Sequence, residues 1–444
     1  MKNIVSGLSE KIVINKNVEK LLLKVQKPGR YVGGELNSVV KNPADVDVRF
    51  AFCFPDTYEI GMSHLGMKIL YSLFNEREDI WCERVFAPWL DFEEVMRQNN
   101  IPLFALESRD PIKDFDFIGF TLQYEMAYTN MLNMLNLAGV PLRSSERDES
   151  HPIVVAGGPC VCNPEPIADF VDIIFLGEGE EVDLEVIDLY KEFKNNGKSK
   201  QEFLEAAAKI DGVYVPSLYK IDYNEDGTIN KIKNSEAAPK TIKKRIIKDM
   251  DKAYYPDKFI VPFIEIVHDR VVLDVFRGCI RGCRFCQAGF SCRPVRKKSP
   301  QVLYRQAVEC MEDSGNNEIT LSSLSTSDYR ELKELTDELI PYCMDRKINL
   351  SVPSLRADNF SLDLMERVQK VRKSGLTFAP EAGTQRLRDA INKNVTEEEV
   401  LTDVDLKKDE KSPKNKTVLF LYDLISVVMS SFIIIAVVFL NFFA

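Results

Sequence analysis

Three cysteines on one short stretch are the residues of this chain best placed to do chemistry. Cys279, Cys283 and Cys286 follow the spacing C-x3-C-x2-C, and a strand-like run, residues 271–276, leads directly into them. Three thiolates on one loop can ligate three corners of an iron–sulfur cube. The fourth iron then keeps an open position, and an open metal position is where a substrate binds and reacts. The spacing therefore indicates a catalytic 4Fe–4S cluster.

Two other uses of these cysteines have to be weighed against a cluster. A zinc site needs a second Cys or His pair at matching spacing, and the nearest further candidates are Cys292 and His268. A disulfide needs an oxidising compartment, whereas the amino terminus shows no secretory signal and 10 cysteines in 444 residues are sparse. A zinc site lacks a second ligand pair at the required spacing, and a disulfide lacks the sign of an oxidising compartment, so a cluster is the better interpretation.

The same residues carry a family resemblance. C-x3-C-x2-C with an aromatic residue, Phe285, just before the third cysteine resembles the motif of radical S-adenosylmethionine (SAM) enzymes. The resemblance implies that SAM chelates the open iron through its amino and carboxylate groups. It also implies that an electron from the cluster splits SAM to a 5′-deoxyadenosyl radical, that Phe285 packs near the adenine, and that a flavodoxin or ferredoxin donates the electron.

The cysteines stand at the start of a strand–helix rhythm that we assign to a radical SAM core, residues 263–402. Further strands are predicted at 317–322, 347–352 and 375–379, with helices between them. Such βα units predict a barrel-type parallel sheet whose active site lies at the carboxyl ends of the strands. By the resemblance, the residues that follow these strands contact SAM, and each could instead be a structural loop residue: Ser322, Ser323, Arg356 and Glu381.

A second strand–helix alternation precedes the core, at residues 46–195, and predicts a Rossmann-like, doubly wound domain. Ligands bind beyond the carboxyl ends of such strands, where two turns hold Gly157, Gly158, Gly177 and Glu178. These turns resemble the cobalamin-binding-type domain found ahead of many radical SAM cores. The chain lacks the D-x-H-x-x-G histidine of that domain, so cobalamin without a protein imidazole and a domain that binds nothing are the two alternatives.

The flanking segments are expected to be structural. Residues 1–45 form an N-terminal collar and residues 196–262 a connector with a basic stretch at 239–248, which we expect to be a solvated strand. The remaining cysteines of the N-terminal part are expected to be small buried apolar residues and not metal ligands: Cys53, Cys82, Cys160 and Cys162.

Positive charge gathers around the cysteine motif. Seven cations and no carboxylate lie between Arg277 and Lys298. A cluster with thiolate ligands is anionic, so these cations are expected to stabilise it. They could equally attract a phosphate-bearing substrate such as RNA, although the formal net charge of −10 argues against a protein that coats nucleic acid in general.

The carboxyl-terminal segment departs from the family pattern. A charged linker, 403–423, leads into 424–444, 21 residues without a charge, which is long enough to span a bilayer. Lysines before it favour a cytoplasmic catalytic body anchored by one C-terminal hydrophobic helix. Because this segment stands where two more βα units are expected, we expect a truncated barrel, through either native tail anchoring or a shifted reading frame.

The sequence therefore predicts a radical SAM enzyme, with methylation or sulfur-type modification of RNA or a small molecule as the plausible reactions. An iron–sulfur electron carrier or sensor that does not cleave SAM is one alternative. An inactive, membrane-tethered fragment is the other.

Overall fold

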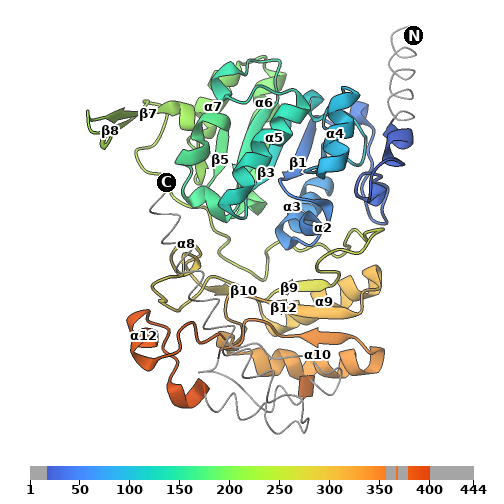
Figure 1. Ribbon diagram of the computed structural model, residues 1–444, viewed down its shortest axis with the longest axis vertical. Coiled ribbons are helices and arrows are strands. Elements are labelled where there is room, and N and C mark those ends of the chain that lie inside the picture. The colour runs from blue at the N-terminus through green and yellow to red at the C-terminus, as the bar shows by residue number, and fades with distance from the viewer. Residues whose placement is uncertain (1–17, 357–366, 369–378, 401–444) are drawn as a thin grey trace. The chain divides into compact units, whose positions relative to one another are not determined.

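The computed structural model describes residues 18–356, 367–368 and 379–400 (Figure 1). The chain divides into two units, which are treated separately below. The first comprises residues 1–273 and 298–319, and the second comprises residues 274–297 and 320–444.

The first unit contains a six-stranded sheet in the order β2-β1-β3-β4-β5-β6. Neighbouring strands from β2 to β5 pair in parallel, and β6 pairs antiparallel with β5. The order 2-1-3-4-5 is that of flavodoxin-like doubly wound folds, in which the strand order reverses between β1 and β3. The predicted α/β class with a parallel sheet is confirmed. The strands are β1 Val48–Phe54, β2 Ile80–Phe86, β3 Phe117–Thr121, β4 Ile153–Gly157, β5 Ile173–Phe175 and β6 Val213–Tyr214.

Helices cover both faces of this sheet and bury alternate strand residues. Ala51 of β1 and Phe120 of β3 belong to one hydrophobic cluster with residues of α4 and α5, whereas Phe50 of β1 belongs to a second cluster with residues of α3, α6 and α7. The strands are buried on both sides, as expected for a parallel sheet. The helices are α2 Tyr58–Gly61, α3 Leu65–Asn75, α4 Leu90–Gln98, α5 Tyr128–Ala138, α6 Gly179–Asn195 and α7 Lys200–Ala207.

The edge strand β2 is held by buried ion pairs and by the N-terminal collar. Arg84 of β2, whose side chain is 1% exposed, pairs with Glu35 and Glu107 at 2.7 Å each. Trp81 of the same strand donates from Nε1 to the carbonyl of Val39 at 3.0 Å. The backbone groups on the free edge of β2 are paired by residues outside the collar, since Cys82 exchanges hydrogen bonds with the Asn75 side chain and the Arg84 N–H donates to Glu107.

The connector forms a small separate hairpin. β7 (Tyr219–Tyr223) pairs antiparallel with β8 (Ile229–Asn234), and this two-stranded hairpin projects from the rest of the first unit (Figure 1). From the predicted basic stretch, Arg245 pairs with Glu181 at 2.8 Å and with Glu185 at 2.5 Å. The predicted solvated strand is wrong, because within 239–248 the structure has only an isolated bridge, from Arg245 to Gly177. The Arg245 cation is neutralised by α6.

The elements around the cysteines begin with β9 and β10 and include a three-stranded sheet in the order β13-β12-β9. Helix α9 begins at Pro300, and Ser299 is its N-cap residue. Of the predicted fourth strand, 375–379, only residue 379 lies within the described residues, so barrel closure stays a prediction. The elements are β9 Val271–Asp274, β10 Phe276–Arg277, α8 Ala288–Ser291, β11 Arg296–Lys297, α9 Pro300–Ser314, β12 Glu318–Ser322, α10 Leu332–Arg346, β13 Asn349–Ser351 and α12 Gln385–Ala390.

Within the part of the chain that the structure describes, no helix is long and apolar enough to cross a membrane. The predicted hydrophobic helix, 424–444, and the linker, 403–423, lie outside the described residues.

Candidate functional site

The three cysteines lie on the loop that leaves β10 and enters α8. Cys283 is buried at 8% exposure, and Cys279 and Cys286 are half-buried. A tight turn joins two of them, since the Cys286 N–H donates to the Cys283 carbonyl at 3.1 Å. The backbone N–H of Arg281 points at the Cys279 sulfur at 3.4 Å. The two contacts fix the backbone of the loop around the cysteines.

The chemistry of this donor set fits a cluster better than its alternatives. All ten cysteines of the chain are free thiols, so the disulfide alternative is not formed. Among the described residues, no three Cys, His, Asp or Glu side chains are grouped so that they could hold one metal ion. A cubane cluster does not need that grouping, because each thiolate binds a different iron.

A glycine fixes the entry to the cysteine loop. Gly278 has φ +96°, and a Cβ atom there would lie 2.6 Å from the carbonyl oxygen of Cys292 and 2.7 Å from that of Pro294. Real Cβ atoms do not approach backbone oxygens so closely, and a positive φ strains any residue with a side chain. The residue before Cys279 therefore has to be glycine for the loop to fold back against residues 292–294.

The predicted SAM contacts that follow β12 lie close to the cysteine strand. The carbonyl of Ser322 accepts from the backbone N–H of Val275 at 3.0 Å, next to β10. The hydroxyl of Ser323 lies 2.9 Å from that of Thr326 and is half-buried. Phe285 is 54% exposed on the cysteine loop itself. Their roles toward SAM stay predictions.

The two charged residues predicted to contact SAM already have protein partners. Arg356 is buried, and its Nη2 donates to the carbonyl of Lys393 at 2.7 Å. Glu381 is exposed, has φ +66°, and pairs with the Lys393 ammonium at 3.0 Å. Both side chains meet at one residue, Lys393, which the sequence reasoning did not single out. Their roles toward SAM also stay predictions.

The fold brings carboxylates to a segment that has none in its own sequence. Arg277 pairs with Asp274 at 2.7 Å, Arg281 pairs with Asp328, and Lys297 pairs with Glu331. Lys298 is 1% exposed. The net positive charge around the cysteines is therefore smaller than the count of seven cations indicates.

At the carboxyl edge of the six-stranded sheet, the predicted glycine turns are used mainly for packing. A Cβ atom on Gly158 would lie 2.5 Å from the Leu122 carbonyl oxygen, and one on Gly177 would lie 2.0 Å from the Arg245 carbonyl oxygen. The Glu178 carboxylate accepts from the Ile247 N–H at 2.6 Å. Of the three glycines in these turns, only Gly157 has open space where a Cβ atom would lie, since the nearest atom would be 3.9 Å from it.

The same edge contains a histidine that the sequence reasoning did not assign to a role. The Nδ1 atom of His64 accepts from the Met67 N–H at 3.1 Å as the N-cap of α3, and Gln123 also hydrogen-bonds the ring. Burial lowers the pKa of His64 to about 4. A Cβ atom on Gly66 would lie 2.8 Å from the His64 ring, so residue 66 has to be glycine for the ring to cap the helix. The His-x-Gly spacing in the sequence could therefore have indicated this cap.

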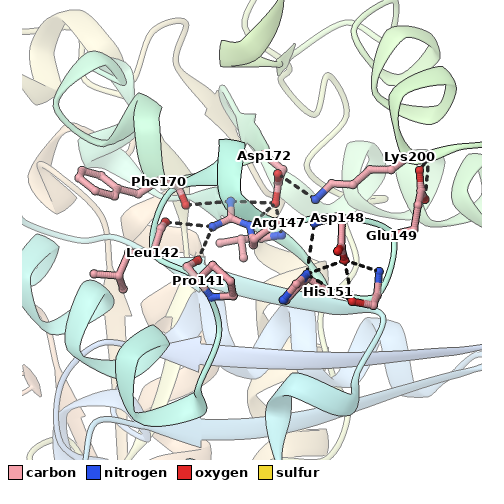
Figure 2. Close-up of polar contacts among 11 residues, drawn as sticks. Pro141, Leu142, Arg147, Asp148, Glu149, His151, Phe170, Asp172 and Lys200 are labelled. Carbon is pink, nitrogen blue, oxygen red and sulfur yellow. Dashed lines mark hydrogen bonds and ion pairs between the residues drawn. The ribbon is translucent and has the colours of Figure 1, made fainter.

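Figure 2 shows a polar network at the opposite, amino edge of this sheet. Arg147 pairs with Asp172 at 3.0 Å and donates to the carbonyls of Pro141, Leu142 and Phe170. A cavity of about 400 Å³ lies beside it, and two of the lysines that line it already pair with carboxylates, Lys194 with Asp116 and Lys200 with Asp172. These contacts connect the segment 141–147 to residues 170–172, and we assign no ligand to the network.

Two family models match the chain. "Radical SAM proteins, N-terminal" matches residues 66–216, and "Radical SAM superfamily" matches residues 273–424. The second range contains the cysteine loop and every residue that we predicted to contact SAM. It extends beyond residue 402, where we had expected the core to end.

Relatives and solved structures agree with these matches. "Uncharacterized protein MJ0966" of Methanocaldococcus jannaschii is 29% identical over 370 residues, 81% of this chain and 66% of that protein. "Putative methylthiotransferase MJ0865" of the same organism is 24% identical over 151 residues, 31% of this chain and 32% of that protein. The radical SAM methyltransferase TsrM of Kitasatospora setae, solved with tryptophan and a SAM analogue, superposes with a TM-score of 0.50 at 11% identity, over 79% of this chain and 62% of that one.

These comparisons bear on family and fold. The chain spans about two thirds of the length of the first relative and about one third of the second. At 11% identity, the likeness to TsrM is one of fold. The prediction made from the cysteine motif is confirmed: the chain carries an N-terminal radical SAM region followed by a radical SAM domain and belongs to the radical SAM superfamily.

Proposed function

We propose that this protein binds a 4Fe–4S cluster through Cys279, Cys283 and Cys286 and is a radical SAM enzyme. The observation that carries the proposal is the loop itself: three free thiols on one turn, inside the range matched by the superfamily model. When bound, the cluster would supply the electron that cleaves SAM reductively. The chain's own contribution is to hold the thiolates and to leave one iron without a protein ligand.

SAM would bind where the cysteine loop exposes apolar side chains. Ile280, Phe285 and Phe290 are 65%, 54% and 68% exposed, and all three lie within twelve residues of one another in the sequence. A contiguous exposed apolar patch marks a ligand site. In this proposal Phe285 packs on the adenine, and the hydroxyls that follow β12, Ser322 and Ser323, hydrogen-bond the amino group of SAM.

The charged ends of SAM would meet Arg356 and Glu381. A guanidinium matches a carboxylate bidentately, so we propose Arg356 for the carboxylate of SAM, beside its contact with the Lys393 carbonyl. Glu381 would accept from the ribose hydroxyls, with Lys393 as its counter-ion.

For the reaction, we propose transfer of a methyl or methylthio group to a small molecule or to RNA, with an electron donor such as a flavodoxin or ferredoxin. The support is the likeness to a named methylthiotransferase and to a methyltransferase fold. An iron–sulfur electron carrier that does not cleave SAM is the competing function. Release of 5′-deoxyadenosine or methionine from SAM by the reduced protein separates the two, since a carrier releases neither.

A second cofactor, cobalamin, is proposed for the first unit. The observation that favours it is a set of apolar side chains exposed after β1, β2 and β3, where ligands of doubly wound sheets bind. Ile60, Trp89 and Met126 are 40%, 46% and 83% exposed there, and Gly157 leaves room for close approach. Since both hydrogen-bonding sides of His64 are engaged, cobalamin would bind without an imidazole ligand from this residue.

The cluster is tested by anaerobic reconstitution of the full chain. We expect about four irons per chain and broad charge-transfer absorption. Cys283→Ala should lose both, whereas Cys292→Ala, a half-buried thiol next to the same loop, is the matched control and should retain them. Equal iron content in the two variants would exclude the assignment.

A further inference from the structure

The cysteine loop is anchored on one side by an ion pair that the motif does not contain. Arg281, which lies between the first two cysteines, donates from Nε to Oδ2 of Asp328 at 2.9 Å and from Nη2 to Oδ1. The side chain of Asp328 is 8% exposed, and Ser325 also donates to it at 2.7 Å. This two-point contact is the geometry in which guanidinium–carboxylate pairs are strongest.

The other side of the loop is anchored by the turn that follows α12. The Asn392 side-chain amide donates to the Gly282 carbonyl at 2.8 Å. Arg284 donates twice to the same turn, from its backbone N–H to the Ile391 carbonyl at 2.9 Å and from Nη1 to the Ala390 carbonyl at 2.6 Å. Residues 282 and 284 flank Cys283, so both contacts act next to the middle cysteine.

The two anchors are joined behind the loop. The Thr326 N–H donates to the Ser354 carbonyl at 3.2 Å, and the Arg356 N–H donates to the Ser327 hydroxyl at 3.2 Å. Arg356 also reaches the Lys393 carbonyl, one residue from Asn392. A continuous ring of contacts thus runs from the cysteine loop through residues 325–328, 354–356 and 392–393 and back to the loop.

We propose that Asp328 and Asn392 are positioning residues that hold the cysteine loop in its cluster-binding conformation before the cluster is inserted. Neither residue ligates iron, and both act through loop residues between the cysteines. The inference rests on the proposed cluster and extends it to residues outside the motif. Ordering a backbone segment costs conformational entropy, so a loop held by the protein binds a cluster more tightly than a loop that must order on binding.

A purely structural role for these residues makes a different prediction. If they only stabilise the second unit, their loss lowers its thermal stability and leaves thiol reactivity and iron retention of the folded protein unchanged. If they position the loop, the thiols become more reactive in the cluster-free protein, and the cluster is lost faster. Thiol alkylation of the apo chain is therefore the deciding readout, and it needs neither SAM nor substrate.

The experiment compares the parent chain with Asp328→Asn and Asn392→Gly, each as the full chain. Asparagine removes the charge at nearly constant shape, and glycine keeps the positive φ of Asn392, which is +57°. Glu331→Gln is the matched control, because it breaks the Lys297 pair of the same segment without touching residues 279–286. Alkylation at Cys283 is followed by mass spectrometry, and iron loss to a chelator is followed by absorbance.

We expect about tenfold faster alkylation of Cys283 and about tenfold or greater acceleration of iron loss in both variants, as for loss of residues that orient metal ligands. The Glu331→Gln control should match the parent. Unchanged alkylation and iron loss in both variants, or equal changes in the control, would overturn the inference. A parent chain that takes up no iron would instead refute the proposed cluster, while the alkylation rates would still decide whether the loop is held.

Discussion

His64 offers the sharpest test of the electrostatics at the carboxyl edge of the first unit. Its Nδ1 atom is an acceptor for the Met67 N–H, so a protonated ring would lose this cap. Burial lowers the pKa of the ring to about 4, against an ordinary value of 6.5. As the pH falls, the ring therefore binds a proton near pH 6.5 in the unfolded chain, but only near pH 4 in the folded chain.

The sign and size of the effect follow from these two values. Between about pH 6.5 and pH 4 the unfolded state binds more protons, so stability is lost as the pH falls through this window. The loss of folding stability amounts to about 2 kcal/mol at pH 5 and is close to zero at pH 7.5. The folded and ordinary pKa values differ by about 2.5, and a difference of one in pKa corresponds to 1.36 kcal/mol once the titration is complete. His64→Asn keeps a capping acceptor and removes the titration.

Tryptophan fluorescence in urea is the assay, because both tryptophans, Trp81 and Trp89, lie in the first unit. We expect the parent to lose about 2 kcal/mol more than His64→Asn between pH 7.5 and pH 5. Identical pH slopes for the parent and His64→Asn would show that the ring is not held neutral, and the argument against an imidazole ligand to cobalt would then fail.

Three further predictions concern buried groups and the loop entry. Arg84→Met leaves Glu35 and Glu107 buried without their cation, so the free energy of unfolding of the first unit should fall by about 3–5 kcal/mol in the same assay. Burial raises the pKa of Asp183, so its stabilising contribution is lost as the pH rises, and Asp183→Asn should gain urea resistance over the parent as the pH rises above the ordinary range of an aspartate. Gly278→Ala should prevent the loop from closing against residues 292–294, which would appear as iron uptake well below that of the parent.

The strand–helix rhythm of the first unit could be predicted because its strands are long apolar runs. The strands predicted at 46–54, 115–120 and 152–158 correspond to β1, β3 and β4, and the helices predicted at 125–138, 182–193 and 201–210 correspond to α5, α6 and α7. Strand β2 was missed because Glu83 and Arg84 interrupt its apolar pattern. Both are buried, Glu83 against Arg49 and Arg84 against Glu35, and these partners come from other parts of the chain. Ion pairs between distant segments leave no periodic signal in the sequence.

The candidate site, too, could be predicted only in its local features. The cysteine spacing is local, so it was sufficient to predict the family. The anchors of the loop are not local: Arg281 meets Asp328 across 47 residues, and Gly282 meets Asn392 across 110. A sequence position alone also does not show that Arg356 and Glu381 share Lys393 as a partner. Residue type predicted the chemistry, whereas tertiary contacts decide how the loop is held.

The charge around the cysteines leads to a last prediction, which concerns RNA as a substrate. Carboxylates pair with Arg277, Arg281 and Lys297, and Lys298 is buried, so at most three of the seven cations of this segment remain for phosphates. Three contacts to single-stranded RNA contribute about 2 to the slope of log affinity against log salt, whereas seven would contribute about 5.

Fluorescence anisotropy of a labelled single-stranded RNA, titrated with the full chain at several salt concentrations, measures this slope. Arg284→Gln removes an exposed cation that donates to a neutral carbonyl and should lower the slope by about 0.7. Lys297→Gln removes a cation that Glu331 already neutralises, so the slope should stay at the parent value. If the two variants lower the slope equally, the ion pairs open to admit phosphates, and the segment is an RNA-binding surface of the strength that its sequence indicates. If only Arg284→Gln lowers it, the electrostatics favour a small molecule over RNA as the substrate.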